Sequence, residues 1–181
     1  MVIPDLTDTF IAGAVAAGAE VFRARDAREA LAAAARLFDE EKIQSIVVSR
    51  SLRKAAEEAG LAFRIPEGQA GIAAAQSGIV RADFGAAETG TLVRLDSDDE
   101  EKLVWTLPPL CVCLLERRKI VPDLQSLAGV LSDHLSQTGI PGPQVSLVTG
   151  PSRTADIECQ LTIGVQGPAR LIIGLIEGAG W

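Results

Sequence analysis

The chain has 181 residues, a length that suits one globular domain, expected over 1–181. Its formal net charge is −7, so nucleic acids and acidic membranes, which are also negatively charged, are poor partners. No apolar run reaches the roughly 20 residues that span a bilayer, and the acidic start MVIPDLTD lacks the basic region of a signal peptide. The three cysteines, Cys111, Cys113 and Cys159, form no CxxC motif and are expected to be reduced, buried thiols of a cytoplasmic protein.

The first third of the chain alternates between helical and strand patterns. Helices are predicted at 9–17, 26–42 and 51–60, and strands at 19–23, 45–49 and 61–65. Asp26, with Glu29 three residues later, has the spacing of a capping box at the start of the second helix. Alternation of this kind, with short connections, is typical of parallel strands joined by crossover helices.

The remainder of the chain is less regular. Two short apolar runs surround a glycine- and alanine-rich turn in 76–96, and the acidic segment 96–102 is predicted to be a solvated loop. Further strands are predicted at 110–115, 145–149 and 170–176, and a helix at 122–137. We therefore expect a three-layer α/β fold in which helices cover both faces of a mostly parallel sheet.

A cluster of polar residues follows the strand predicted at 145–149, in the sequence GPSRTADIE at 150–158. After the turn at Gly150, Ser152 or Thr154 can cap a helix whose first turns contain Asp156 and Glu158. The same geometry exposes backbone N–H groups at the carboxyl end of a strand, where ligands of open α/β sheets usually bind. Arg153 adds a guanidinium group suited to phosphate or carboxylate, so capping alone and capping with an anion site both remain open.

A second cluster lies in FGAAETGTLVRL at 84–95, where glycines bracket a turn and Glu88 precedes two threonines. If the two clusters converge in space, one pocket can be formed by the side chains of Glu88, Thr89, Thr91, Ser152, Arg153 and Asp156. Glu88 is the candidate catalytic base or nucleophile.

The chain lacks the residues that several kinds of catalytic or cofactor site require. His134 is the only histidine and lies inside a leucine-striped helix, which makes a Ser-His-Asp mechanism and a catalytic zinc improbable. The chain has no GxxxxGK[ST] motif, no GxGxxG motif after a strand and no cysteine array for an iron–sulfur cluster. We expect no metal site and no covalently bound cofactor.

Several motifs stand in the order found in the LUD-domain family, which the chain resembles from about Phe10 to its C-terminus. They are AETGTLV at 87–93, LPPLCV at 107–112, KIV at 119–121, GPSRTADIE at 150–158 and GVQGP at 164–168. The family usually has histidine where this chain has Gln166. If that histidine transfers a proton, Gln166 cannot replace it; if it only forms a hydrogen bond, Gln166 can.

The resemblance implies a fold like the NagB, ribose-phosphate isomerase and CoA-transferase group, and a bacterial, cytoplasmic role in oxidising L-lactate to pyruvate. It implies iron–sulfur partners of the LutA and LutB types, with the clusters in those partners only. Fold kinship adds, by analogy, a small anionic ligand. The ligand-binding residues expected on this basis are Thr89, Gly90, Thr91, Gly150, Ser152, Arg153, Thr154 and Asp156. Two alternatives are a stand-alone transferase or isomerase that uses Glu88, and a purely structural or regulatory partner of the iron–sulfur proteins.

Overall fold

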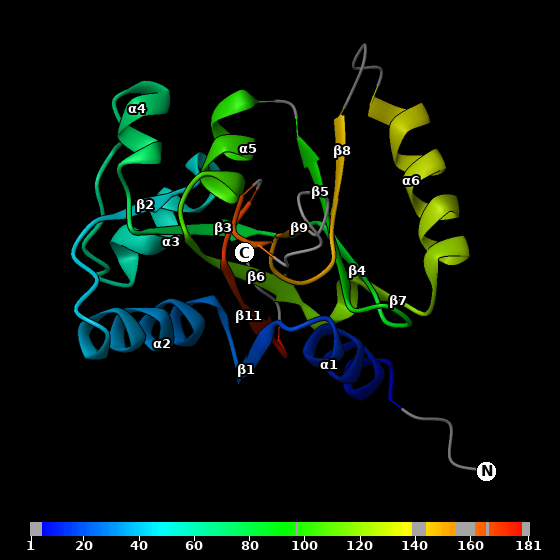
Figure 1. The fold of residues 1–181 in the computed structure, drawn as a ribbon. Coiled ribbons are helices and arrows are strands. Elements are labelled where there is room, and N and C mark those ends of the chain that lie inside the picture. Colours follow the sequence, from blue (N-terminus) through cyan, green and yellow to red (C-terminus); the bar gives the residue numbers. More distant parts are fainter. Residues whose placement is uncertain (1–4, 97, 139–143, 155–161, 166, 179–181) are drawn as a thin grey trace.

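Five parallel strands form the central sheet of the computed structural model, which describes residues 5–96, 98–138, 144–154, 162–165 and 167–178 (Figure 1). Neighbouring strands stand in the order β1 (Glu20–Ala24), β11 (Arg170–Ile176), β6 (Leu110–Glu116), β3 (Ser77–Arg81) and β2 (Ile46–Val48). Each neighbouring pair is parallel. The central strand β6 is buried along its whole length, as a strand covered on both faces must be.

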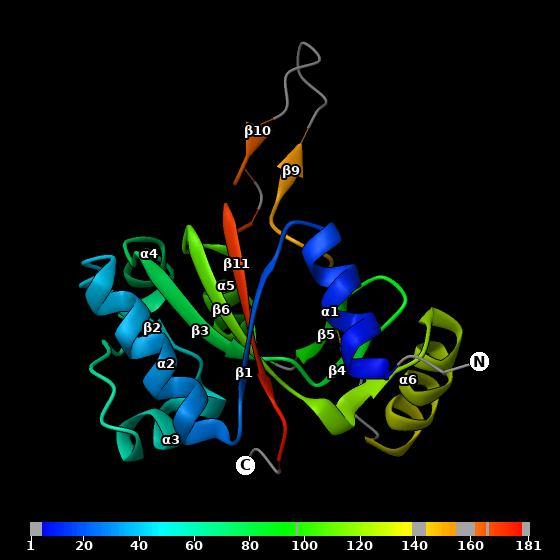
Figure 2. The same cartoon turned by 90° about the horizontal axis from the view of Figure 1, so that it is seen from below.

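Helices cover both faces of this sheet, which confirms the predicted three-layer α/β arrangement (Figure 2). They are α1 (Leu6–Ala16), α2 (Ala27–Glu40), α3 (Arg53–Glu58), α4 (Gly68–Ala73) and α5 (Asp99–Thr106). On one face α2 and α3 pack through Leu31 and Ala56 in one core cluster with Val112 of β6. On the other face α1, α4 and α5 enclose a second core with Cys113 of the same strand. Successive side chains of β6 thus enter opposite cores.

A second sheet, which the sequence did not predict as a separate unit, lies beyond α1 and α5. Its strands stand in the order β7 (Ile120–Val121), β4 (Phe84–Ala86), β5 (Thr91–Asp96) and β8 (Gln144–Val148). β5 is antiparallel to both of its neighbours, and β4 and β7 are parallel. α6 (Leu124–Thr138) covers the far face of this sheet, where Leu127 packs with Ala86 and Val93.

Three local predictions are wrong. The segment predicted as a strand at 61–65 forms only an isolated bridge between Val47 and Arg64. Residues 99–102 of the segment predicted as a solvated loop form the start of α5, because the Asp98 side chain accepts a hydrogen bond of 2.9 Å from the Glu100 N–H and caps the helix. Asp96, at the start of that segment, is the last residue of β5. No helix begins at Ser152, because β9 (Arg153–Thr154) pairs there with β10 (Thr162–Ile163) in an antiparallel ribbon. The alternative cap, Thr154, is followed by residues that lie outside the described ones, Asp156 and Glu158 among them.

Other local predictions are confirmed with small shifts of their bounds. Asp26 caps α2 by accepting a hydrogen bond of 2.8 Å from the Glu29 N–H. The helix predicted at 51–60 begins as a 3₁₀ turn, Arg50–Leu52, and continues as α3. A second 3₁₀ turn, Arg117–Lys119, follows β6. None of the described helices is long and apolar enough to cross a membrane.

Candidate anion site

The two polar clusters found in the sequence meet where β5 begins and β8 ends. The antiparallel register sets Leu92 opposite Val148, which brings Thr91 beside Thr149. The Oγ1 atoms of Thr91 and Thr149 are 2.7 Å apart, and those of Thr89 and Thr91 are 2.6 Å apart. Three hydroxyl groups from two distant segments therefore form one hydrogen-bonded chain.

Glycines allow both turns to contact the C-terminal end of α1. Gly90 has a φ of +65°, and a Cβ atom there would lie 2.0 Å from the backbone nitrogen of Ala14. Gly150 has a φ of +71°, and a Cβ atom there would lie 2.2 Å from the carbonyl oxygen of Ala17. Both positions require glycine for conformation and for space. The end of α1 is consequently seated between the two turns that carry the polar clusters.

Arg153 also lies against this end of α1. A Cβ atom on Gly18 would lie 2.0 Å from Nη2 of Arg153, so the guanidinium occupies the space above that glycine. The backbone of Ser152, which precedes Arg153, is hydrogen-bonded to the part of the chain that precedes β11. The Ser152 N–H donates to the carbonyl of Pro168 at 2.9 Å, and the Gly164 N–H donates to the carbonyl of Ser152 at 3.0 Å. Arg153 itself remains exposed to solvent.

A cleft of about 300 Å³ lies beside these residues. Its described lining residues are Trp105, Thr106, Leu147, Val148, Thr149, Gly150, Pro151, Ser152, Arg153, Gly167 and Pro168. Among them Arg153 carries the only charged side chain. A small cleft with one arginine and several hydroxyl and backbone groups has the composition of an anion site.

The sequence indicated a site at the carboxyl ends of the parallel strands, but the cleft lies at their amino ends. The Gly150 turn does follow the carboxyl end of a strand, but that strand, β8, belongs to the second sheet. Trp105 and Thr106 precede β6, and Gly167 and Pro168 precede β11, so the cleft borders the amino ends of the parallel strands. The rule for carboxyl ends of parallel strands therefore does not apply here.

The other predicted site residues lie apart from the cleft or outside the described residues. Glu88 is exposed, and its N–H donates to the carbonyl of Pro122 at 3.0 Å, just before α6. It is not among the described residues that line the cleft. Thr154 belongs to β9, and its side chain is not described. Asp156 and Gln166 lie outside the described residues.

Trp105 and Thr106 are lining residues that sequence reasoning missed. They end α5, a helix that the sequence did not predict, and they stand immediately before the LPPLCV motif. Trp105 is only 3% exposed, and its spacing from Glu101 and Val104 places it on the buried face of the helix. That spacing is the one feature of the sequence that could have identified Trp105. It indicates a residue of the hydrophobic core as readily as a residue that lines a binding site.

The two described cysteines are structural. Cys111 and Cys113 are fully buried in β6, and burial raises the pKa of Cys111 to about 12 and that of Cys113 well above its ordinary range. Neutral, buried thiols are poor metal ligands and poor nucleophiles. Within the described ranges no group of three or more His, Cys, Asp or Glu residues is arranged to hold a metal ion.

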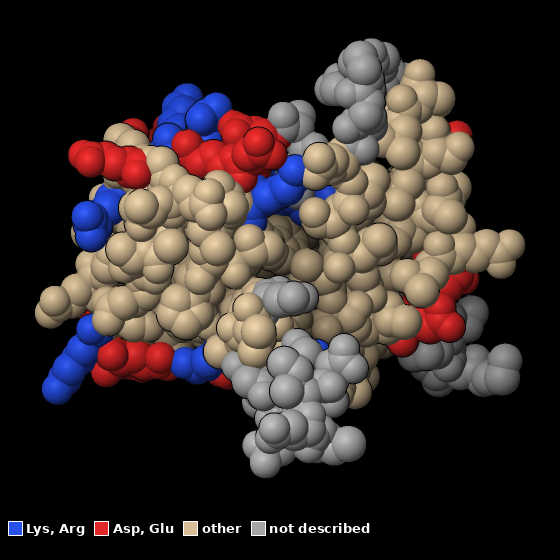
Figure 3. Space-filling model, turned by 45° about the horizontal axis from the view of Figure 1, so that its top comes forward, with Lys and Arg blue, Asp and Glu red and all other residues tan. Residues whose placement is uncertain are grey.

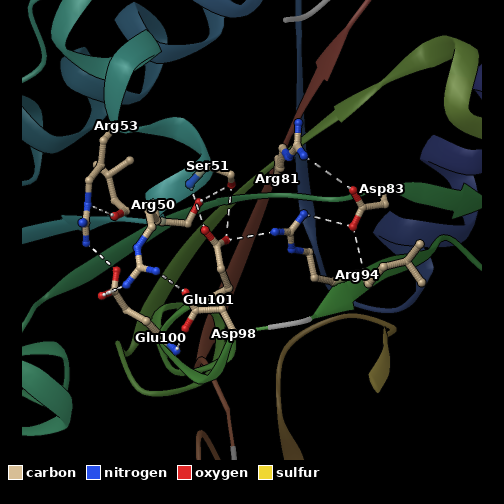
Figure 4. Close-up of polar contacts among 12 residues, drawn as sticks. Arg50, Ser51, Arg53, Arg81, Asp83, Arg94, Asp98, Glu100 and Glu101 are labelled. Carbon is tan, nitrogen blue, oxygen red and sulfur yellow. Dashed lines mark hydrogen bonds and ion pairs between the residues drawn. The ribbon is translucent and has the colours of Figure 1, made fainter. Parts of the chain in front are cut away.

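A separate network of ion pairs and hydrogen bonds lies outside the cleft (Figure 4). Glu101 accepts hydrogen bonds from the Ser51 N–H at 2.8 Å and from Nη2 of Arg94 at 3.1 Å. Asp83 accepts from Nη1 of Arg94 at 3.0 Å and from the Leu95 N–H at 2.8 Å. Each carboxylate already accepts hydrogen bonds from at least two donors. Because the donors and acceptors come from different elements, the network joins α5 and the second sheet to the 3₁₀ turn after β2.

Charge on the molecular surface is mixed. On the face shown in Figure 3, basic and acidic side chains lie next to one another near the upper edge, and most of the described surface is uncharged. Neighbouring side chains of opposite charge form ion pairs, such as Arg50 with Asp98 at 2.7 Å and Arg53 with Glu100. That face has no broad basic stripe of the kind that binds nucleic acid.

Comparison with known proteins identifies relatives over much of the chain. Residues 66–176 match the LUD domain. The chain is 30% identical over 164 residues to the uncharacterized protein YkgG of Escherichia coli, which covers 82% of this chain and 70% of that protein. It is 30% identical over 96 residues to lactate utilization protein C of Geobacillus kaustophilus, covering 53% of this chain and 40% of the relative.

A solved structure agrees with the fold. The crystal structure of a DUF162 family protein from Deinococcus radiodurans matches with a TM-score of 0.71 at 16% sequence identity, covering 94% of this chain and 96% of that one. The match to lactate utilization protein C of Geobacillus kaustophilus and of Bacillus licheniformis spans only about two fifths of each relative, 40% and 43%. The domain match and the shared motifs together show that the chain belongs to the LUD-domain family.

Proposed function

We propose that this chain is a non-redox component of lactate utilisation that binds a small anionic metabolite in the cleft beside Arg153. Relatives named lactate utilization protein C support the physiological setting. The observation that carries the binding proposal is the exposed guanidinium of Arg153 beside a cleft of about 300 Å³. The volume lies at the lower end of the range of small-molecule sites, which suits a metabolite of a few heavy atoms.

The residues around Arg153 are suited to a carboxylate. A guanidinium forms two parallel hydrogen bonds to a carboxylate, and its charge does not titrate at physiological pH. Ser152 and Thr149 add hydroxyl groups to the same wall, and the Thr149 hydroxyl is held by Thr91. No described lining residue carries a negative charge that would repel an anion.

The oxidation of lactate to pyruvate releases two electrons and two protons, which need acceptors. Cys111 and Cys113 are buried and neutral, so the described part of this chain offers no thiolate for a cluster or a redox disulfide. In this proposal the electrons pass to iron–sulfur partners of the LutA and LutB types, and this chain holds the anion. The alternative of an enzyme that uses Glu88 has no comparable support, because Glu88 is not among the described cleft residues.

The test is a thermal-shift and titration series with L-lactate and pyruvate on the wild type, Arg153→Ala and a control, Arg25→Ala. The control removes an arginine whose side chain is 86% exposed and which follows the carboxyl end of β1, at the other edge of the sheet. A ligand at 100 times its dissociation constant adds about 2.7 kcal/mol to the free energy of unfolding. We expect the wild type and Arg25→Ala to show this gain and Arg153→Ala to lose it.

Two other results count against the proposal. Equal stabilisation of the wild type and Arg153→Ala would place the anion elsewhere. If neither anion binds while Arg153→Ala weakens assembly with purified iron–sulfur partners, the chain is a structural or regulatory subunit instead.

A further inference from the structure

Trp105 has a buried hydrogen-bond donor without an acceptor. Its side chain is 3% exposed, and among the described residues its indole Nε1 has no hydrogen-bond partner. Nine in ten or more buried polar groups in proteins are hydrogen-bonded, so an unpaired one calls for an explanation. The indole nitrogen can only donate, so it needs an oxygen or another acceptor.

The same residue forms part of the wall of the cleft that contains Arg153. Trp105 is the penultimate residue of α5, and Thr106, which ends the helix, also lines the cleft. The Thr106 hydroxyl is already used, since it donates to the carbonyl of Lys102 at 2.9 Å. The cleft therefore combines a fixed positive charge with a residue that has an unpaired neutral donor.

We propose that Trp105 is a specificity residue, whose indole N–H donates to the 2-oxygen of a short 2-hydroxy or 2-oxo carboxylate held by Arg153. This inference rests on the proposed function and names the ligand class more closely. Arg153 satisfies both oxygens of the carboxylate, and the oxygen on the neighbouring carbon is then the acceptor left over. A hydroxyl oxygen and a carbonyl oxygen both accept, so substrate and product of a lactate oxidation fit the same donor.

Burial of Nε1 strengthens the expected selectivity. Solvent does not reach this nitrogen, so a water molecule is not a ready substitute for the ligand oxygen. Recognition of the 2-oxygen therefore requires that a small displacement of the cleft wall on binding brings the ligand oxygen to Nε1. A carboxylate without that oxygen leaves the N–H unpaired.

The experiment compares L-lactate with propionate, which has the same charge and carbon skeleton but no 2-oxygen. Dissociation constants are measured by ligand-observed NMR for the wild type, Trp105→Phe and Arg153→Ala. We expect the wild type to prefer L-lactate by about ten-fold, the effect of one well-placed hydrogen bond to a buried group. Trp105→Phe keeps the aromatic packing and should bind both acids equally, whereas Arg153→Ala should weaken both.

The outcomes separate this inference from the proposed function. If Trp105→Phe still prefers L-lactate, Trp105 does not read the 2-oxygen, although the anion site at Arg153 stands. If the wild type binds neither acid more tightly than Arg153→Ala does, the anion site itself fails and this inference fails with it.

A second measurement keeps Trp105 in place, in case its replacement disturbs folding. The chain has two tryptophans, and Trp181 lies outside the described residues. In Trp181→Phe all tryptophan fluorescence comes from Trp105, and saturating L-lactate should shift its emission while propionate does not. An unchanged emission spectrum at saturation with L-lactate would overturn the inference.

Discussion

At the scale of single residues, Arg94 is a buried cation that is paired with two carboxylates. Its side chain is 8% exposed and lies 3.0 Å from Asp83 and 3.1 Å from Glu101, whose side chain is 7% exposed (Figure 4). Removing one partner of a buried ion pair leaves an uncompensated charge and typically costs about 3–5 kcal/mol. We expect Arg94→Met to lower the free energy of unfolding by about that amount, measured by urea denaturation.

The matched control for Arg94→Met is Arg25→Met, which removes an arginine paired with Glu29 at the surface. That pair lies at 2.9 Å, but the side chain of Arg25 is 86% exposed, so its loss should change the free energy of unfolding by less than about 1 kcal/mol. Similar, small losses in both variants would mean that the two carboxylates near Arg94 find other partners or become protonated. The sequence alone gave no sign of this difference, because the partners of Arg94 come from a separate helix and a separate turn.

At the scale of elements, the packing of α1 depends on glycines in the turns that it contacts. A Cβ atom on Gly90 would meet the backbone of Ala14 at 2.0 Å, and the φ of +65° is itself unfavourable for other residues. Overpacking and backbone strain each cost about 1–3 kcal/mol. We expect Gly90→Ala to lower the free energy of unfolding by at least about 2 kcal/mol in urea denaturation.

Two other glycines separate the causes of that loss. Gly60 has a φ of +72° with no atom near its missing Cβ, so Gly60→Ala should cost only the strain, about 1–2 kcal/mol. Gly129 lies within α6, where a Cβ atom would also meet nothing, so Gly129→Ala should raise the free energy of unfolding by up to about 1 kcal/mol. A loss in Gly90→Ala no larger than that in Gly60→Ala would show that α1 moves aside without cost.

The elements that the sequence predicted well are those with strong local signals. The continuous apolar runs of β6 and β11 and the Asp26 cap of α2 are visible within a few residues. The start of α5 was missed although Asp98 provides the same kind of cap, because a dense acidic run also fits a solvated loop. The separation of β4 and β5 into a second sheet depends on pairing with distant segments, which no local pattern records.

At the scale of the whole molecule, the candidate site shows a similar limit. The sequence identified residue types suited to an anion, but their meeting requires Thr91 and Thr149, 58 residues apart, to stand opposite each other in the second sheet. It misplaced the site relative to the parallel sheet, because the sheet to which β8 belongs is set by long-range pairing. Trp105 was not predicted as a site residue, because a buried tryptophan on a helix usually belongs to the hydrophobic core.

Stability of the whole molecule should decline at both ends of the pH range, and the acid end depends on helix caps. A hydrogen bond from the Thr7 N–H lowers the pKa of Asp5 at the start of α1, and one from the Ser126 N–H lowers that of Asp123 before α6. A carboxyl with a lowered folded pKa contributes stability above its unfolded pKa, near 3.8, that is lost as the pH falls through the folded value. Asp123→Asn keeps an acceptor without titrating and should flatten this acid dependence.

The alkaline end depends on the buried thiols, whose pKa values shift in the opposite direction. The unfolded chain releases the Cys111 proton near pH 9, whereas burial keeps it on the folded chain up to about pH 12. Because the folded state then holds more protons, the free energy of unfolding should fall as the pH rises above 9, by about 1.4 kcal/mol per pH unit for each such thiol. Urea denaturation between pH 8 and 11 measures this slope. Cys111→Ala should remove one thiol's share of it whatever the variant's absolute stability, and an unchanged slope would mean that solvent reaches the thiol in the folded protein.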